Sequence, residues 1–420
     1  MKKNIFLYAC SIALNRGSLL LFFPFLAASF SLSSFGKWNL IIIVANLLMP
    51  ILTLNGSSSI LREGSLDICK GNYLLKKYLL FTTVLNVTLL FILFVFFSTS
   101  WIIYSVLIGF LEGIIYLIIT YYRVLDKAFI YFFINLLKIL VLFLVILYVT
   151  IYQTTLYVLL VYYILALLLF VVFVIIHLFI KNNIDYKQTS VEKALKFSIL
   201  LIPHGISQWI MSSSDRVIIE YVLGSAMLGV YSLAFSISAG LMLINSAIIL
   251  IVPTYMIKSY DMWKTRLYDK KIIKIYTLVS ICLFFIILLI CSVDNKFTHI
   301  LKYYNRNMVM IIYFIYFGIY LLGLYYFYAN YLFFHAKAYI ISKTTFYTAI
   351  LNIMLTCLFA YILGVLGAAI ATFISYICYL FLIRRECLKI EKNITFNLAR
   401  SIMIFTICIT IVGGIFYYEI

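Results

Sequence analysis

Long apolar runs follow one another along the chain, separated by short polar segments. Each run extends over roughly 20 residues, the length that an α-helix needs to cross the hydrocarbon core of a bilayer. The pattern predicts thirteen membrane-spanning helices, at residues 4–29, 38–61, 78–97, 101–122, 130–150, 156–180, 197–222, 227–255, 275–293, 308–334, 345–363, 366–383 and 401–418. The predicted fold class is an all-α polytopic membrane protein.

Composition excludes a water-soluble enzyme. The chain is 66% hydrophobic and 11% charged, whereas soluble domains are about 45–50% apolar and about 25% charged. We find no phosphate-binding Walker A loop, no H-E-x-x-H and no C-x-x-C ligand spacing, so we expect no enzyme, no cofactor and no metal. The eight cysteines are interpreted as structural.

Basic residues are distributed unevenly between alternate connections. One set of connections holds 25 Lys and Arg, whereas the other set holds only Lys37, Lys296, Lys302 and Arg306. The positive-inside rule therefore places the N-terminus and the basic connections in the cytoplasm. The net charge of +18 is explained by topology and by contact with anionic membrane lipids, so we expect no nucleic-acid partner.

Shifting the chain by 193 residues against itself indicates an internal repeat. The shift aligns Gly36 with Gly229 and residues 35–40 with residues 228–233. Because six helices return the chain to its starting side, the repeat is parallel. We predict an N-terminal six-helix lobe at 1–180, a cytoplasmic linker at 181–196, a C-terminal lobe at 197–383, and a basic segment with a thirteenth helix at 384–420.

All four prolines fall in the first two helices of each predicted lobe. They are Pro24, Pro50, Pro203 and Pro253. Proline removes a helical hydrogen bond and bends the helix. We therefore predict that spans 1, 2, 7 and 8 are bent and line the interface between the lobes, although membrane helices also tolerate proline without any mechanical role.

Polar residues recur at helical spacing in the same helices, which predicts hydrated faces. Span 1 carries Tyr8, Ser11, Asn15 and Ser18 on one face, and span 7 carries His204, Gln208, Ser212 and Asp215. Span 2 carries Asn39, Asn46 and Thr53, which the shift of 193 residues maps onto Ser232, Ala239 and Ser246 of span 8. Small polar residues also serve as helix-packing contacts in lipid. Taken together, the four helices favour a hydrated cavity, to which we assign Asn15, Asn46, His204 and Gln208.

Charged residues within the predicted spans are the strongest functional signal, because each costs about 2.5–3.5 kcal/mol at a helix centre. Arg16, Glu112, Lys138, Asp215 and Arg216 lie within spans, and Glu220 lies near an outer end. Glu112 is a candidate ion-pair partner for Lys138. Arg216 and Glu220 are spaced for a pair on one helix. Asp215 and Arg216 are equally consistent with a helix interface and with contact to substrate.

Three groups of segments, which cover both lobes, resemble a known family. They are residues 194–204 and 209–216 with 223–224 and 228–232, residues 15–24 with 35–38, and Gly364 with residues 367–372. Together they resemble the Wzx-type O-antigen flippases, of the polysaccharide transporter branch of the multidrug/oligosaccharidyl-lipid/polysaccharide exporter superfamily.

The resemblance implies two six-helix bundles around a central cavity, which move undecaprenyl-pyrophosphate-linked oligosaccharide from the cytoplasmic to the periplasmic leaflet of the bacterial inner membrane by alternating access. It implies lipid-linked oligosaccharide as ligand and other polysaccharide assembly proteins, such as the polymerase, as partners, and it leaves coupling to H⁺ or Na⁺ open. A thirteenth span departs from the twelve or fourteen of many relatives.

Fixed positive charge is what a pyrophosphate needs along a path through hydrocarbon. Arg16 is the first candidate for the phosphate contact, because a guanidinium binds phosphate in bidentate fashion, and Lys138 is the second. Two alternatives remain. A cation-coupled multidrug exporter of the same superfamily needs acidic cavity residues, of which Glu112 is the candidate in the first lobe. A membrane-embedded glycan polymerase is opposed by the short outer connections.

Overall fold

The computed structural model describes residues 7, 8, 10, 11, 14, 15, 22, 25 and 26, and residues 29–419 apart from 97–100, 182–189, 259–266, 298–304, 336 and 391–397. Three of the residues singled out by the sequence, Arg16, Ser18 and Pro24, lie outside the described residues.

The described chain folds into helices at the places that the apolar runs predict. They are α2 (Leu32–Leu52), α3 (Gly56–Leu66), α4 (Ile68–Phe96), α5 (Trp101–Val124), α6 (Ala128–Ile151), α7 (Leu156–Lys181), α8 (Val191–Leu223), α9 (Ser225–Ser238), α10 (Gly240–Lys258), α12 (Leu267–Phe297), α13 (Arg306–Phe334), α14 (Ala338–Ile390) and α15 (Leu398–Glu419). Within the described ranges, nine helices are long and apolar enough to cross a membrane, and α9 with α10 adds a tenth as a bent pair. The predicted all-α polytopic fold is confirmed.

Helices form here because hydrocarbon offers no hydrogen-bond partners, so each apolar run must satisfy its own backbone groups. The connections are tight turns. Asp126 and Gln153 adopt φ values of 53° and 47° between α5 and α6 and between α6 and α7. Gly364 interrupts α14 with φ 63° and ψ −143°, a conformation that favours glycine. The two helices predicted at 345–363 and 366–383 meet at this glycine.

Contacts divide the chain into two compact units. The first comprises Met1–Asn15 and Lys37–Trp209, and the second comprises Arg16–Gly36 and Ile210–Ile420. Both α2 and α8 therefore contribute residues to each unit. These units are defined by contacts, and the lobes at 1–180 and 197–383 remain a prediction.

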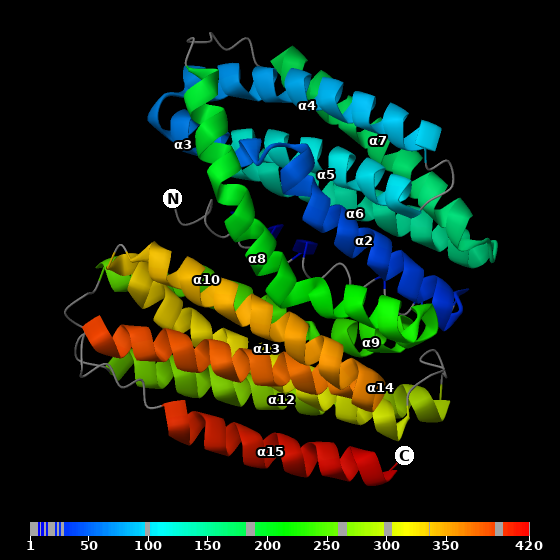
Figure 1. The fold of residues 1–420 in the computed structure, drawn as a ribbon, viewed down its shortest axis with the longest axis vertical. Helices are drawn as coiled ribbons and strands as arrows, with labels where there is room; N and C mark the ends of the chain where they lie inside the picture. The colour runs from blue at the N-terminus through cyan, green and yellow to red at the C-terminus, as the bar shows by residue number, and fades with distance from the viewer. Residues whose placement is uncertain are drawn as a thin grey trace. The chain divides into compact units, whose positions relative to one another are not determined.

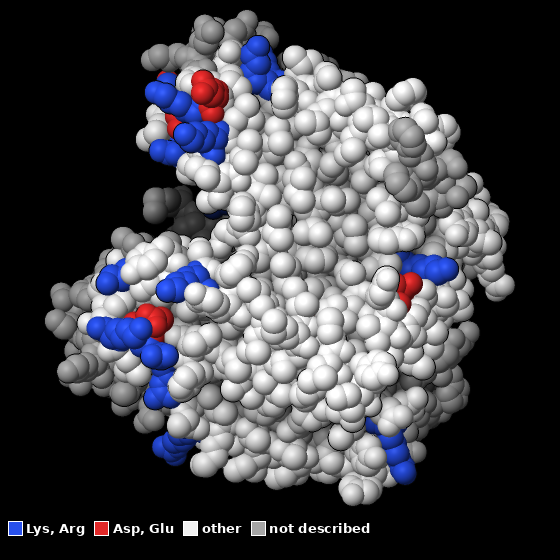
Figure 2. Space-filling model, viewed as in Figure 1, with Lys and Arg blue, Asp and Glu red and all other residues white. Residues whose placement is uncertain are grey.

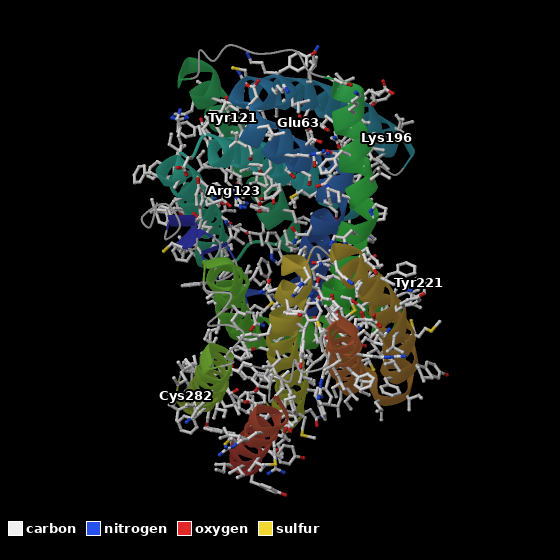
Figure 3. The ribbon with its side chains drawn as sticks, turned by 90° about the vertical axis from the view of Figure 1, so that its left-hand side faces the viewer. Glu63, Tyr121, Arg123, Lys196, Tyr221 and Cys282 are labelled. Carbon is white, nitrogen blue, oxygen red and sulfur yellow. The ribbon has the colours of Figure 1, made fainter. Side chains whose placement is uncertain are left out.

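The first unit is built around α5, which packs against α3, α4, α6 and α7. Fifteen of its residues are buried, among them Tyr121, whereas Arg123 lies in its last turn (Figure 3). A Cβ at Gly109 would lie 2.7 Å from the carbonyl oxygen of Ala45, so glycine permits the close approach of α5 to α2. The first half of α8 joins this unit through the Ser59–Ser198 hydroxyl pair at 2.5 Å.

The second unit is built around α13, which contacts α9, α10, α14 and α15. Figure 1 shows α12, α13 and α14 running side by side, with α15 alongside α12. The predicted thirteenth helix is α15, and its Phe405 ring stacks on Tyr320 with centroids 3.6 Å apart. Helices α9 and α10 meet near Ala239 at an angle of 51°.

The described prolines differ in their local structure. Pro50 lies two residues before α2 ends, and Leu54 and Asn55 in the following turn have φ values of 50° and 49°. Pro203 lies inside α8, and Pro253 lies inside α10. A bend of 51° in the predicted span 227–255 falls at Ala239. The mechanical role of the prolines remains a prediction.

Charged residues lie at the margins of the surface that Figure 2 shows, whereas most of that surface is white. One patch of mixed sign lies over α3 and the start of α4, where Arg62 and Glu63 pair at 3.9 Å (Figure 2). The apolar surface agrees with a chain surrounded by lipid. The eight cysteines, all of which lie in the described part of the chain, form no disulfide, and Cys282 is exposed on α12 (Figure 3).

Candidate functional site

Three helices of the first unit bring Glu112, Lys138 and Tyr163 together. The Lys138 ammonium on α6 donates to Glu112 Oε2 on α5 at 2.7 Å. The Tyr163 hydroxyl on α7 donates to the other carboxylate oxygen, Oε1, at 2.9 Å. The side chains of Lys138 and Glu112 are 21% and 20% exposed, so the ion pair is partly accessible. The ion pair that the sequence suggested is therefore formed.

One face of α6 continues this site toward the first predicted span. Tyr131, Asn135 and Lys138 are spaced at i, i+4 and i+7, which aligns them on the helix. The Asn15 amide donates to Asn135 Oδ1 at 2.7 Å, and the Tyr8 ring lies edge-on to Tyr131 with centroids 5.1 Å apart. Asn15 is thus joined to the same polar face of α6 as Lys138, whereas the hydrated face of the first span remains a prediction.

The indole ring of Trp38, on α2, packs against the Tyr163 ring at one side of the site. The two ring centroids lie 5.6 Å apart, and both side chains are buried. Packing fixes the phenol, whereas Lys138 reaches Glu112 through a flexible four-carbon stem. The remaining predicted cavity residues of this unit are Asn46, which is exposed on α2, and Gln208 and His204, which are exposed and half-buried on α8. Their part in a cavity remains a prediction.

The second unit contains a buried carboxylate, that of Asp215 in the second half of α8. Asp215 is 3% exposed. Its Oδ1 accepts from the backbone N–H of Arg216 at 2.8 Å, and its Oδ2 accepts from the Tyr231 hydroxyl of α9. The Thr372 hydroxyl of α14 lies 3.4 Å from the same Oδ2. Of the two interpretations of Asp215, a helix interface and a substrate contact, these bonds favour the interface.

The charges that follow Asp215 do not pair with each other. The Arg216 guanidinium lies 3.6 Å from the ring centroid of Phe235 and donates to Ser212 O at 3.3 Å. Glu220 accepts from the Ser225 hydroxyl at 2.6 Å. Among the described residues no ion pair joins Arg216 to Glu220, because the guanidinium turns back toward the preceding turn of α8. The four-residue spacing of Arg216 and Glu220 correctly placed both residues on one helix, but the ion pair that it suggested between them is wrong.

Sequence reasoning missed the hydroxyl and aromatic partners of these charges. Tyr163 and Thr372 come from helices distant in the sequence from the carboxylates that they contact, whereas Tyr231 lies on the helix that follows Asp215. Tyrosine is common in this chain, with 36 copies. The spacing of these partners carries no signal that separates them from core residues. The stripe formed by Tyr131, Asn135 and Lys138 was visible in the sequence and could have identified α6 as part of the site.

Comparison with known proteins gives one family match and several solved structures with the same fold. Residues 121–294, which include Lys138 and Tyr163, match the family model described as "Polysaccharide biosynthesis protein". No curated protein sequence matches the chain.

Solved transporter structures share the fold over nearly the whole chain. A MATE protein in its straight conformation is 14% identical, with a TM-score of 0.62, and the match covers 93% of this chain and 97% of that one. An outward-facing multidrug resistance MATE transporter of the MOP superfamily is 13% identical, with a TM-score of 0.57 and coverages of 93% and 96%.

A third structure of this fold is a MOP superfamily transporter from Pyrococcus furiosus. It is 13% identical, with a TM-score of 0.61 and coverages of 93% and 96%, and its description reports a binding pocket of reversed polarity. The chain therefore has the MATE-like fold of MOP superfamily transporters, together with a match to a polysaccharide biosynthesis family over residues 121–294.

Proposed function

We propose that the protein is a flippase that moves undecaprenyl-pyrophosphate-linked oligosaccharide repeat units, as in O-antigen assembly, from the cytoplasmic to the periplasmic leaflet by alternating access. It acts as a multi-pass protein of the bacterial inner membrane, with the N-terminus in the cytoplasm. The observation that carries the proposal is a partly accessible cation within a membrane span, Lys138, which is 21% exposed and lies in the segment that matches the polysaccharide family.

The chemistry of this site fits a lipid-linked sugar diphosphate. A diphosphate needs fixed positive charge along its path, because it cannot enter hydrocarbon unpaired. The Asn15 amide and the ring of Tyr131 lie on the same face as Lys138, and the buried Asn135 amide holds Asn15 in place. Amide groups hydrogen-bond sugar hydroxyls in both directions, since they donate and accept. The polyprenyl tail would remain in the lipid.

A cation-coupled multidrug exporter is the second candidate, because several MATE structures share the fold. A cationic drug requires an acidic group that is free to receive it. Glu112 is neutralised by Lys138 at 2.7 Å, which disfavours a cationic ligand at this site. The reversed pocket polarity described for the Pyrococcus furiosus transporter is a precedent for this fold with a different charge at its site.

A deletion strain tests the proposal. Without the protein, lipid-linked repeat units should accumulate on the cytoplasmic face of the inner membrane, and a plasmid copy of the gene should restore their export. The Lys138→Gln variant, expressed at the wild-type level, should fail to restore it. Unchanged repeat-unit export in the deletion strain, together with increased sensitivity to cationic drugs, would favour the multidrug exporter instead.

A further inference from the structure

Lys138 is already engaged in the structure, although a flippase needs this cation for its substrate. Its ammonium is 2.7 Å from Glu112 Oε2. The ammonium has three N–H donors but only one positive charge, and Glu112 already neutralises that charge. A phosphate that bound Lys138 beside Glu112 would therefore be repelled by the carboxylate. Glu112 is therefore an internal competitor for an anionic ligand.

The surroundings of Glu112 allow it to lose Lys138 without being left unpaired. The second carboxylate oxygen accepts from the Tyr163 hydroxyl at 2.9 Å, and Tyr163 is fixed because it is 4% exposed and packs against Trp38 at 5.6 Å. The exchange therefore moves the flexible partner, Lys138, and retains the rigid one. A charged carboxylate that keeps a hydrogen-bond donor is less costly in a membrane than a bare one.

We propose that Glu112 sets the specificity of Lys138 by competition: a ligand carrying a diphosphate displaces the carboxylate from the ammonium, and Tyr163 holds the displaced carboxylate until the ligand leaves. This inference rests on the proposed function and extends it. A neutral or cationic ligand cannot make the exchange, whereas a diphosphate carries more negative charge than one carboxylate. When the ligand leaves, Glu112 neutralises Lys138 again, so that no isolated charge remains within the span.

Competition predicts opposite changes in diphosphate affinity for the two variants Glu112→Gln and Tyr163→Phe. Glu112→Gln removes the competing charge but keeps the side-chain size, so affinity for a diphosphate should rise about 10-fold to 100-fold, the equivalent of one charge-assisted hydrogen bond. Tyr163→Phe removes the alternative partner of Glu112, so the carboxylate holds Lys138 more tightly and affinity should fall several-fold. Lys138→Gln should abolish binding.

The experiment measures binding of farnesyl diphosphate to the purified full-length protein in lipid nanodiscs by titration calorimetry, with farnesol as the uncharged comparison. Glu386→Gln is the matched control, because Glu386 also pairs with a lysine, Lys389, at 2.6 Å but lies near the end of α14. This control should bind like the wild type.

The two proposals fail in different ways. Failure of the wild-type protein to bind farnesyl diphosphate would refute the proposed function and, with it, the competition at Lys138. Diphosphate binding by the wild type with no increase in affinity in Glu112→Gln would overturn the competition alone. The same direction of change in Glu112→Gln and Tyr163→Phe would also overturn it, because a purely structural ion pair gives both variants one sign.

Discussion

Replacement of Gly229 by alanine tests a close helix crossing in the second unit. Here the start of α2 lies against α9. A Cβ added at Gly229 would overlap the carbonyl oxygen of Leu32 and lie 2.8 Å from its carbonyl carbon, and a Cβ at Gly36 would overlap the carbonyl oxygen of Ser225 and lie 2.9 Å from the Gly229 nitrogen. Gly36 and Gly229 are 193 positions apart, as are Leu32 and Ser225. The crossing therefore follows the internal repeat.

The expected cost of Gly229→Ala follows from these contacts. All the clashing atoms belong to the backbone, so the helices must separate, and such overpacking costs about 1–3 kcal/mol. Alanine recovers up to about 1 kcal/mol through its greater helix propensity. We therefore expect a net loss of about 1–2 kcal/mol in the free energy of unfolding. In the Gly229→Ala variant, the further change Gly36→Ala should lower the free energy of unfolding by less than Gly36→Ala does in the wild type, because the two helices are already separated.

Thermal unfolding in detergent measures this effect. Gly229→Ala should lower the apparent Tm by several degrees. Gly414→Ala is the matched control, because Gly414 lies inside α15 of the same unit and a Cβ there would have no neighbour within 4 Å. That variant should keep or slightly raise the Tm. Equal melting of the two variants would refute the reasoning that glycine is required at the crossing.

Three further predictions follow from other features. Tyr231→Phe should destabilise the second unit by about 1–3 kcal/mol in thermal melting, because it removes a donor from the buried Asp215, and unchanged melting would show that this bond contributes nothing. Pro203→Ala, within α8, should lower repeat-unit export at normal abundance, whereas wild-type export would leave the proline without a mechanical role. Reporter fusions after Lys70 and Lys193 should report the cytoplasm and one after Gln153 the periplasm, and a cytoplasmic result at Gln153 would overturn the predicted helix count before it.

The sequence predicted the helices well because lipid leaves an apolar run of sufficient length few alternatives. Residues 366–383 and 401–418 form helices as predicted, in α14 and α15. Local breaks were harder to predict. The turn at Leu54 and Asn55 splits the second span into α2 and α3 through positive φ values. Leu54 gives no signal of this conformation, but Asn55 followed by Gly56 is a turn dipeptide that the apolar pattern overrode. The bend at Ala239 has no proline beside it.

The candidate site was predicted only in part, because periodicity along one helix cannot identify partners on another. Charge identified Glu112 and Lys138, and their mutual attraction made the ion pair a reasonable hypothesis. Nothing in the sequence distinguishes Tyr163 from other tyrosines. Arg216 illustrates the opposite error, because its spacing from Glu220 suggested an ion pair, whereas packing directs the guanidinium onto Phe235. Spacing describes which residues share a face but not which neighbour they prefer.

Transbilayer movement of a polyprenyl-diphosphate-linked oligosaccharide in proteoliposomes tests the central claim most directly. The wild-type protein should accelerate this movement over protein-free liposomes. Lys138→Gln should reduce it to the protein-free rate, and the double variant Glu112→Gln with Lys138→Gln should remain equally inactive although its ion pair no longer needs to be satisfied. No acceleration by the wild type, or full activity in the double variant, would contradict a flippase that recognises diphosphate through Lys138.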